Sequence, residues 1–267
     1  MSRIKVTGLY IYPVKGCGGI SLSSMKLDDH GPLFDRQFLL VDKNNRFVTQ
    51  RTHPVLATIG IQLNAKLNHL SLSIGKQQYT LHMNDEFKAP ELEVTIWKDQ
   101  AKAIPASSLL NQWLSHQIGD DVQLVKLVNR PVRDKDGTKF KTRFTDGYPF
   151  LIANEKSLEK LNKSLNPKIP MNRFRPNIVI DGNSEFEEDH WHKFSLGKTK
   201  FETMKDCERC IVITVDQKTG IKSSEPLSWL KKVHSKHGTP TFGINAISLN
   251  RSSLNLGDEF KEETFRL

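Results

Sequence analysis

The chain has 267 residues and a formal net charge of +9, because 39 lysines and arginines outnumber 30 aspartates and glutamates. Hydrophobic residues make up 37% of it, and no apolar run approaches the roughly 20 residues of a membrane span, so we expect no membrane association. The first residues enter a strand without an apolar signal segment, and an odd number of cysteines without a signal suits a reducing compartment. We therefore expect a cytoplasmic globular protein of one or two domains.

Strand patterns dominate the first part of the chain. Alternating and β-branched residues predict the strands, and a polar turn at residues 43–46 joins two of them into a hairpin. A second hairpin crosses the short turn at Gly75. The predicted strands are residues 4–12, 36–42, 47–50, 70–74, 78–82 and 91–98.

The second part alternates strands with a few helices. Apolar residues at helical spacing predict a helix over residues 107–118, which Gly119 ends, and we place a domain boundary there. Asn154 caps a second predicted helix over 155–165, and a short third one covers 226–233. The predicted strands are residues 121–128, 178–180, 199–204 and 211–215. The pattern is typical of a β-rich, barrel-like mixed α/β protein.

A basic stretch follows the boundary. Its cations are opposed only by Asp134 and Asp136, and they are Lys126, Arg130, Arg133, Lys135, Lys139, Lys141 and Arg143. Such a stretch suits a solvated loop or a surface for an acidic partner. It lacks interleaved aromatic residues and any zinc-finger pattern, so we expect no nucleic-acid binding.

The segment Cys207-Glu208-Arg209-Cys210 holds two of the three cysteines. A structural zinc site needs four ligands, and no second cysteine pair or suitably spaced histidine pair is present. A thioredoxin-like site places its cysteines at a helix start, whereas residues 211–215 suggest a strand. What remains is a single thiolate, favoured by Arg209 and used as a ligand or nucleophile, or an incidental buried pair.

Two segments suit an anion. Lys15 precedes Gly16 in a glycine-rich turn, whose backbone N–H groups can form a nest for a phosphate, although a plain tight turn explains it equally well. Residues 172–177 carry two arginines suited to phosphate or carboxylate, and Asn177 offers an amide. Arg36 is a third candidate contact, or an ordinary surface partner of its neighbour Asp35.

Together these segments resemble the MOSC-domain proteins, and most closely the bacterial YcbX-type proteins and the mitochondrial amidoxime-reducing component. The resemblance extends over nearly the whole chain and implies an N-terminal MOSC β-barrel-like domain at residues 1–119 and a MOSC β-barrel domain at 120–267. The matching motifs, in the family's order, are residues 12–15, 34–36, 144–152, 172–180, 187–191 and 207–216.

The resemblance implies a molybdenum cofactor, a molybdopterin whose metal is bound by one cysteine, which falls here on Cys210. Glu208 and Gly16 depart from serines that are frequent in the family, and Cys207 is expected to support Cys210. Asp146 is expected near the substrate. The implied cofactor contacts are Lys15, Gly16, Arg36, Thr145, Arg175, Asn177, Glu208, Arg209 and Cys210.

The activity implied by the resemblance is reduction of small N-hydroxylated compounds to the amine or amidine and water. No cysteine follows Cys210, so the spacing of an iron–sulfur module is absent and electrons are expected from a separate ferredoxin- or flavoprotein-type donor. We place this donor on the basic stretch. Related MOSC domains occur in molybdenum-cofactor sulfurases, which links the family to pyridoxal phosphate, although we expect no pyridoxal-phosphate domain here. A sulfur carrier using Cys210, or a carrier or store of the cofactor, is the alternative.

Overall fold

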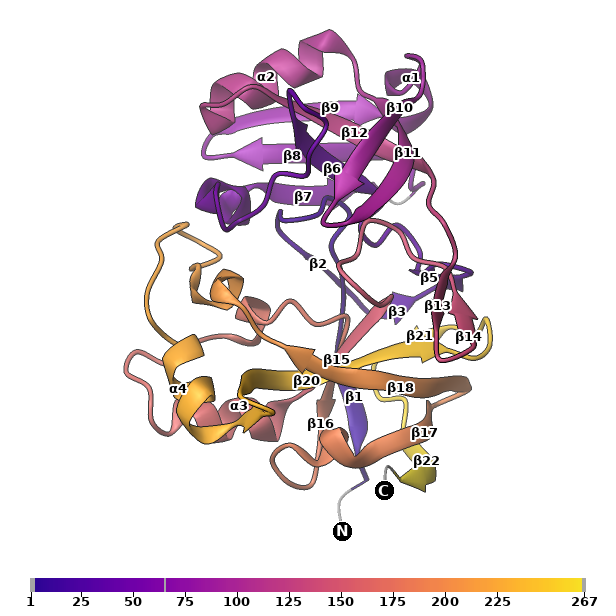
Figure 1. Ribbon diagram of the computed structural model, residues 1–267, viewed down its shortest axis with the longest axis vertical. Helices are drawn as coiled ribbons and strands as arrows, with labels where there is room; N and C mark the ends of the chain where they lie inside the picture. The colour runs from indigo at the N-terminus through magenta and orange to yellow at the C-terminus, as the bar shows by residue number, and fades with distance from the viewer. Residues whose placement is uncertain (1–2, 65, 266–267) are drawn as a thin grey trace.

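Two sheet systems, stacked along the long axis of the molecule, build most of the computed structural model, which describes residues 3–64 and 66–265 (Figure 1). The strands up to the middle of the chain are β1 (Lys5–Ile11), β2 (Ile20–Leu22), β3 (Ser24–Met25), β4 (Leu27–Asp28), β5 (Gly31–Pro32), β6 (Phe38–Asp42), β7 (Gly60–Leu63), β8 (His69–Ile74), β9 (Gln77–His82), β10 (Leu92–Ile96), β11 (Asp99–Pro105) and β12 (Val122–Asn129).

The remaining elements belong mainly to the lower half in Figure 1. Its strands are β13 (Arg133–Lys135), β14 (Thr138–Phe140), β15 (Phe150–Asn154), β16 (Ile178–Asp181), β17 (Trp191–Leu196), β18 (Thr199–Glu208), β19 (Ser235–Lys236), β20 (Thr239–Ser248), β21 (Leu254–Asn255) and β22 (Phe260–Phe265). The α-helices are α1 (Met83–Glu86), α2 (Ser108–Ile118), α3 (Glu155–Asn162) and α4 (Leu227–Val233), and the 3₁₀ turns are η1 (Pro54–Thr58), η2 (Met171–Arg173), η3 (Glu187–His190) and η4 (Ile211–Thr214).

The upper half combines the antiparallel sheet β10-β11-β12-β6 with the meander β7-β8-β9, and α2 covers it (Figure 1). The predicted helix forms because Ser107 caps it, accepting a 3.3 Å hydrogen bond from the Leu110 N–H. Gly119 then adopts φ = 80° and ends it. Leu110 and Leu114 are buried, whereas Leu109 is exposed.

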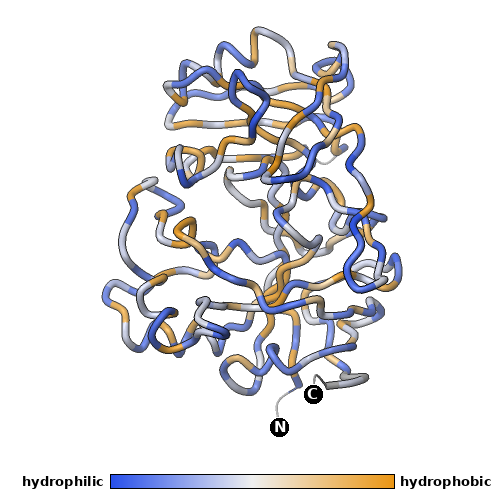
Figure 2. The backbone as a smooth tube through the Cα atoms, in the orientation of Figure 1, coloured by the Kyte–Doolittle hydropathy of each residue, from blue (hydrophilic) through white to orange (hydrophobic). Residues whose placement is uncertain are grey.

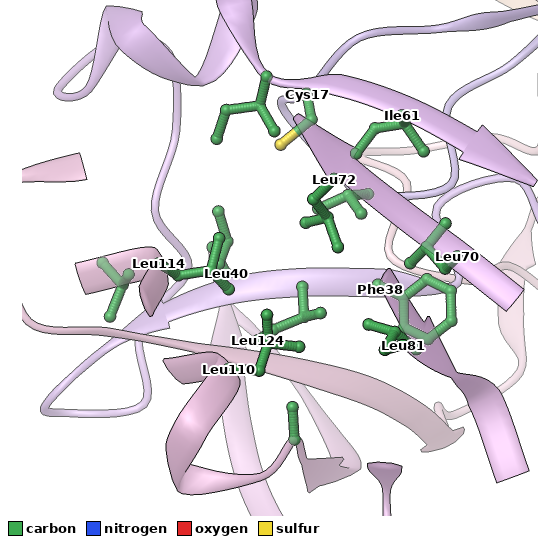
Figure 3. Close-up of a cluster of buried hydrophobic side chains, with 14 of the residues drawn as sticks. Cys17, Phe38, Leu40, Ile61, Leu70, Leu72, Leu81, Leu110, Leu114 and Leu124 are labelled. Carbon is green, nitrogen blue, oxygen red and sulfur yellow. The ribbon is translucent and has the colours of Figure 1, made fainter. Parts of the chain in front are cut away.

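Cys17 belongs to the hydrophobic core of this upper half, among residues such as Phe38, Leu40 and Leu72 (Figure 3). Its side chain is fully buried, and burial raises the pKa of the thiol to about 12. Cys17 is therefore a core residue with an un-ionised thiol, and it is neither a ligand nor a nucleophile.

The lower half is built on one large sheet in the order β2-β1-β16-β15-β20-β18-β17-β22, with β19 added beside β20. β15 and β16 run parallel, and the other pairs in this order are antiparallel. Figure 2 shows that hydrophobic residues concentrate along the strands while several connecting loops are hydrophilic. The β-rich fold expected from the sequence is confirmed.

The first strand of the chain belongs to this lower sheet. β1 pairs with β16, so that Lys5 lies opposite Asp181 and Leu9 opposite Ile178. The boundary that we place at residue 119 therefore does not coincide with the division between the two sheet systems. β1 and β2 precede residue 119 in the sequence but belong to the large sheet of the lower half.

Two predicted strands are wrong. Residues 47–50 make only an isolated bridge at Phe47 and then turn, because the Thr49 carbonyl accepts hydrogen bonds from Thr52 and His53. Residues 211–214 form η4, in which the Thr214 hydroxyl donates a 2.7 Å hydrogen bond to the Ile211 carbonyl. The predicted helix over 155–165 ends earlier, at Asn162. In the two segments predicted as strands, local polar contacts override the β-branched composition.

Candidate functional site

A cavity of about 460 Å³ lies where the upper and lower halves meet. Its walls come from the turn after β1, the segments around residues 47–51 and 145–148, the turn before β16, and the end of β18. Every site residue expected from the sequence lines it, namely Lys15, Gly16, Arg36, Thr145, Asp146, Arg175, Asn177, Glu208, Arg209 and Cys210. The structure therefore brings the separate sequence motifs to one place.

Cys210 is exposed at this cavity, just beyond the end of β18. Its sulfur accepts a 3.2 Å hydrogen bond from Nη2 of Arg51. We expected Arg209 to favour the Cys210 thiolate, but the Arg209 guanidinium contacts the Cys207 sulfur at 2.9 Å and the Phe174 carbonyl at 2.8 Å. The reason is that side chains alternate along an extended segment, so that residue 209 shares a face with 207 and not with 210. The cation beside Cys210 comes instead from the upper half.

Two arginines enclose the ring of Tyr12 at the base of the site. The Arg36 and Arg175 guanidinium carbons lie 4.4 Å and 4.2 Å from the ring centroid. Burial raises the pKa of Tyr12 to about 12, against the influence of the two arginines, so the phenol stays neutral and donates to the Pro176 carbonyl. Asp35 binds Arg36 at 2.6 Å. The layer is thus rigid and positively charged.

Three buried polar atoms of this cavity have no hydrogen-bond partner. They are Nη2 of Arg175, Nε of Arg209 and Oγ1 of Thr145. Burial lowers the pKa of Arg175 to about 10, which still leaves it a cation at neutral pH. Buried polar groups are nearly always satisfied, so three such groups in one cavity indicate a polar, anionic ligand.

The side-chain amide of Asn177 is partly used within the fold. Its oxygen accepts from the Leu151 N–H at 3.2 Å and its nitrogen donates to the Tyr10 carbonyl at 3.2 Å. The side chain therefore joins β15 to β1 while lining the cavity. These two bonds use one N–H and one lone pair of the amide, so the expected contact of Asn177 with a ligand stays a prediction.

Lys15, Asp146 and Trp97 form a hydrogen-bonded group on another wall. Oδ1 of Asp146 accepts from Nζ of Lys15 at 2.7 Å and from Nε1 of Trp97 at 2.8 Å. The Asp146 side chain is 63% exposed, yet the neighbouring protein atoms keep some water from its carboxyl and oppose ionisation. The Lys15 ammonium, together with Trp97 and Arg51, outweighs this effect and lowers the pKa of the carboxyl below its usual range. Lys15 also donates to the Phe144 carbonyl, so that one of its three N–H groups remains for an anion.

Arg51, Trp97 and Gln50 are functional candidates that the sequence reasoning missed. Gln50 exchanges hydrogen bonds with Gln217 and donates to the Gly16 carbonyl at 2.6 Å, and Gln217 in turn accepts from Arg175. No motif marks these residues. They reach the cavity only through the packing of the two halves, which leaves no local signal in the sequence.

The basic stretch contains two cations that face inward. Arg130 and Arg143 are each 5% exposed, and they form ion pairs with Asp99 and Asp28. Arg130 also donates to the Thr145 carbonyl at 2.8 Å, which supports the loop beside Asp146. The expectation of an exposed basic docking loop is therefore wrong for these two, because each guanidinium satisfies buried carbonyl groups.

Within residues 3–64 and 66–265, no cluster of three or more His, Cys, Asp or Glu side chains could enclose a metal ion. A metal at Cys210 would accordingly depend on a single protein sulfur. In the same ranges, no helix is long and apolar enough to cross a membrane.

Comparisons with known proteins agree with this architecture. The MOSC N-terminal beta barrel domain matches residues 3–121, and the MOSC domain matches residues 139–261. Mitochondrial amidoxime-reducing component 1 of Homo sapiens is 30% identical over 282 residues, covering 95% of this chain and 81% of the relative, and that of Mus musculus is 30% identical, covering 85% and 70%.

A molybdenum cofactor sulfurase of Oryza sativa subsp. japonica is 32% identical over 270 residues and covers 91% of this chain. The chain spans only about a third of the length of that relative. The chain belongs to the MOSC-domain family, with a MOSC N-terminal β-barrel domain followed by a MOSC domain. Within this family it is a distant homologue of the mitochondrial amidoxime-reducing components and of the molybdenum cofactor sulfurases.

Proposed function

We propose that the protein is a molybdenum-cofactor oxidoreductase that reduces N-hydroxylated compounds. The observation that carries the proposal is one cavity that combines an exposed cysteine with buried, unpartnered cationic donors. Cys210 would bind the metal, because a soft thiolate suits it. The unpartnered donors of Arg175, Arg209 and Thr145 would bind the anionic, heteroatom-rich pterin. Similarity to proteins named as amidoxime-reducing components supports the same reaction.

The residues that hold the cofactor fit its charge. Lys15, Arg36 and Arg175 all line the cavity and present positive charge to it, and Tyr12 between the arginines keeps both guanidinium planes in place. The exposed Glu208 is paired with Lys205 at 2.9 Å, which reduces its repulsion of an anion. The bound cofactor would supply the two-electron chemistry that removes an oxygen atom from an N–O bond.

The protein's own part in the reaction is binding and proton handling. Both donors to Asp146 bind Oδ1, so we assign Oδ2 to accept an N–H or O–H group of the substrate. The balanced reaction consumes two electrons and two protons per N–O bond and gives the amine and one water. The reaction takes up protons, and Lys15 holds one at Nζ, 2.7 Å from Oδ1 of Asp146, so that a proton can pass from the ammonium through the carboxylate to the substrate oxygen that leaves as water.

The donor of the electrons is proposed to be a separate ferredoxin- or flavoprotein-type protein. Since Arg130 and Arg143 are buried, its docking surface on the basic stretch would be limited to exposed cations such as Lys139 and Lys141. The three cysteines are free thiols, which supports our proposal of a reducing, cytoplasmic location.

The test compares wild type with Cys210→Ala purified side by side from a host that overproduces the cofactor. Wild type is expected to hold near-stoichiometric molybdenum and pterin and to reduce benzamidoxime with an artificial electron donor. The variant is expected to lose the metal and the turnover. A variant that keeps both molybdenum and activity would contradict the proposal. Cys17→Ala is the matched control, because Cys17 lies outside the cavity, in the core.

A second candidate is a sulfur carrier, or a carrier of the molybdenum cofactor. The 32% identity to a molybdenum cofactor sulfurase favours it, as does the exposure of Cys210. A persulfide on Cys210 after purification, found by mass spectrometry together with absent turnover, would support the sulfur carrier. Bound cofactor without turnover would support the cofactor carrier.

A further inference from the structure

Arg51 is the residue of the upper half that reaches the cysteine of the lower half. Its Nη2 donates to the Cys210 sulfur at 3.2 Å across 159 positions of sequence. Its charge also acts on Asp146, but among residues 3–64 and 66–265 no carboxylate lies within ion-pair distance of Arg51. The guanidinium gives its charge-assisted hydrogen bond to the sulfur.

Arg51 is held in place from three directions. Its guanidinium stacks over the ring of Trp97, with 4.4 Å between the guanidinium carbon and the ring centroid. Its carbonyl accepts a 2.7 Å hydrogen bond from Nζ of Lys222, in the loop that follows η4, and its N–H donates to Oγ1 of Thr49 at 3.1 Å. The two hydrogen bonds thus hold the Arg51 backbone, and the Trp97 ring supports the guanidinium.

The loop after η4 is also fitted closely against the segment that carries Arg51. Gly220 has φ = 72°, and a Cβ there would lie 3.2 Å from the Pro54 carbonyl oxygen. The neighbouring residue Gln50 exchanges amide hydrogen bonds with Gln217 of the same loop. The position of Arg51 relative to Cys210 therefore depends on contacts between the upper half and the loop that follows Cys210 in the sequence.

We propose that Arg51 is a positioning residue of the Cys210 site, which orients the sulfur and compensates its negative charge when it serves as a ligand. The inference rests on the proposed function. A hydrogen bond to a ligand atom fixes its orientation, and a cation beside a thiolate ligand favours the more reduced state of the centre. The metal site is then composite, since one half of the molecule supplies the ligand and the other supplies its partner.

The test uses Arg51→Gln, Arg51→Lys and Arg46→Gln. Arg46 is an exposed arginine of the same segment, so R46Q removes one charge nearby without touching the cavity. Each protein is produced with the cofactor, and three quantities are measured: the rate of molybdenum and pterin loss on dialysis, the reduction potential of the bound metal, and the thermal unfolding midpoint. R51Q is expected to lose metal about 10- to 100-fold faster than R46Q and to show a lower potential.

R51K keeps the positive charge but not the planar donor, so it is expected to restore the potential in large part and the metal retention only in part. If R51Q does not fold, the comparison of R51K with R46Q carries the test through metal retention. Wild type that binds neither molybdenum nor pterin would overturn both the proposed function and this inference. Wild type that binds both, with R51 variants indistinguishable from R46Q in retention and potential, would overturn this inference alone.

Discussion

Lys15 and Asp146 lie 131 positions apart in the sequence, and Nζ of Lys15 donates a 2.7 Å hydrogen bond to Oδ1 of Asp146. The contact joins the glycine-rich turn after β1 to the loop before β15. The Lys15 side chain is 12% exposed and that of Asp146 is 63% exposed, so the carboxylate faces the cavity mouth while the ammonium lies beneath it. The pair presents an ionised carboxylate to any molecule that enters.

Replacing Asp146 by asparagine is expected to reduce kcat about 10²- to 10⁴-fold with little loss of bound molybdenum, because the change removes the proton-handling carboxylate and leaves Cys210 intact. Steady-state reduction of benzamidoxime and metal analysis measure the two effects. Asp136→Asn, at an exposed position of the β13–β14 turn, is the matched control. A D146N protein as active as D136N would remove Asp146 from the reaction.

Replacing Trp97 by phenylalanine is expected to lower kcat more than it raises KM, because it deletes the indole N–H that donates to Asp146 while keeping a ring under Arg51. Loss of one hydrogen bond to a charged group corresponds to about 1.5–3 kcal/mol, or roughly a 10- to 100-fold loss in kcat. Trp97→Ala is expected to add a loss of metal retention, because Arg51 then loses its aromatic support. Equal metal retention in the two variants would contradict that role of the ring.

Replacing Arg143 by glutamine is expected to cost about 2–4 kcal/mol of unfolding free energy, because the buried guanidinium binds Asp28, the Pro32 carbonyl and Gln37. The exposed neighbour Lys141, replaced in the same way, is expected to change stability by no more than about 0.5 kcal/mol. Urea unfolding of both variants gives the comparison. Equal stabilities would show that Arg143 behaves as a surface residue.

Glu188 makes stability depend on pH. Burial, with repulsion from Asp189, raises the pKa of this fully buried carboxyl to about 7, while Asn154 and Ser157 donate to it. Because the pKa of Glu188 is raised in the folded state, its contribution to the free energy of unfolding is complete below about pH 4.5 and is lost as the pH rises through about 7. Wild type should therefore lose on the order of 1–3 kcal/mol between these pH values relative to Glu188→Gln. The check is the free energy of unfolding of both proteins, measured from pH 5 to 8. If it changes with pH by the same amount in the two proteins, the raised pKa of Glu188 is refuted.

The elements that could be predicted from the sequence are those whose signals are local. The helix α2 follows from a capping serine, apolar spacing and a terminal glycine within a dozen residues, and the hairpin β8–β9 from two alternating runs around Gly75. Residues 211–214 could not be predicted in this way, because their apolar β-branched run suits a buried strand and a buried 3₁₀ turn equally.

The residues of the site divide in the same way, into those with a local sequence signal and those without one. Lys15, Arg175 and Cys210 stand in recognisable segments, and the structure brings these segments to one cavity. Arg51 and Trp97 carry no such pattern, since their importance arises from contacts with residues far along the chain. The error over Arg209 has a simpler cause: adjacency in sequence suggests contact, whereas an extended backbone directs neighbouring side chains to opposite faces.

The pairing of β1 with β16 sets an order of events during synthesis. Residue 5 leaves the ribosome long before its partner at residue 181, and at ordinary translation speeds the delay is on the order of ten seconds. During this interval the upper half, whose strands all precede residue 130, can fold, while β1 has only the short strand β2 beside it and its other edge stays open. The nascent chain is therefore most exposed to misassembly and to chaperone capture at its very beginning, and closure of the large sheet is its last step.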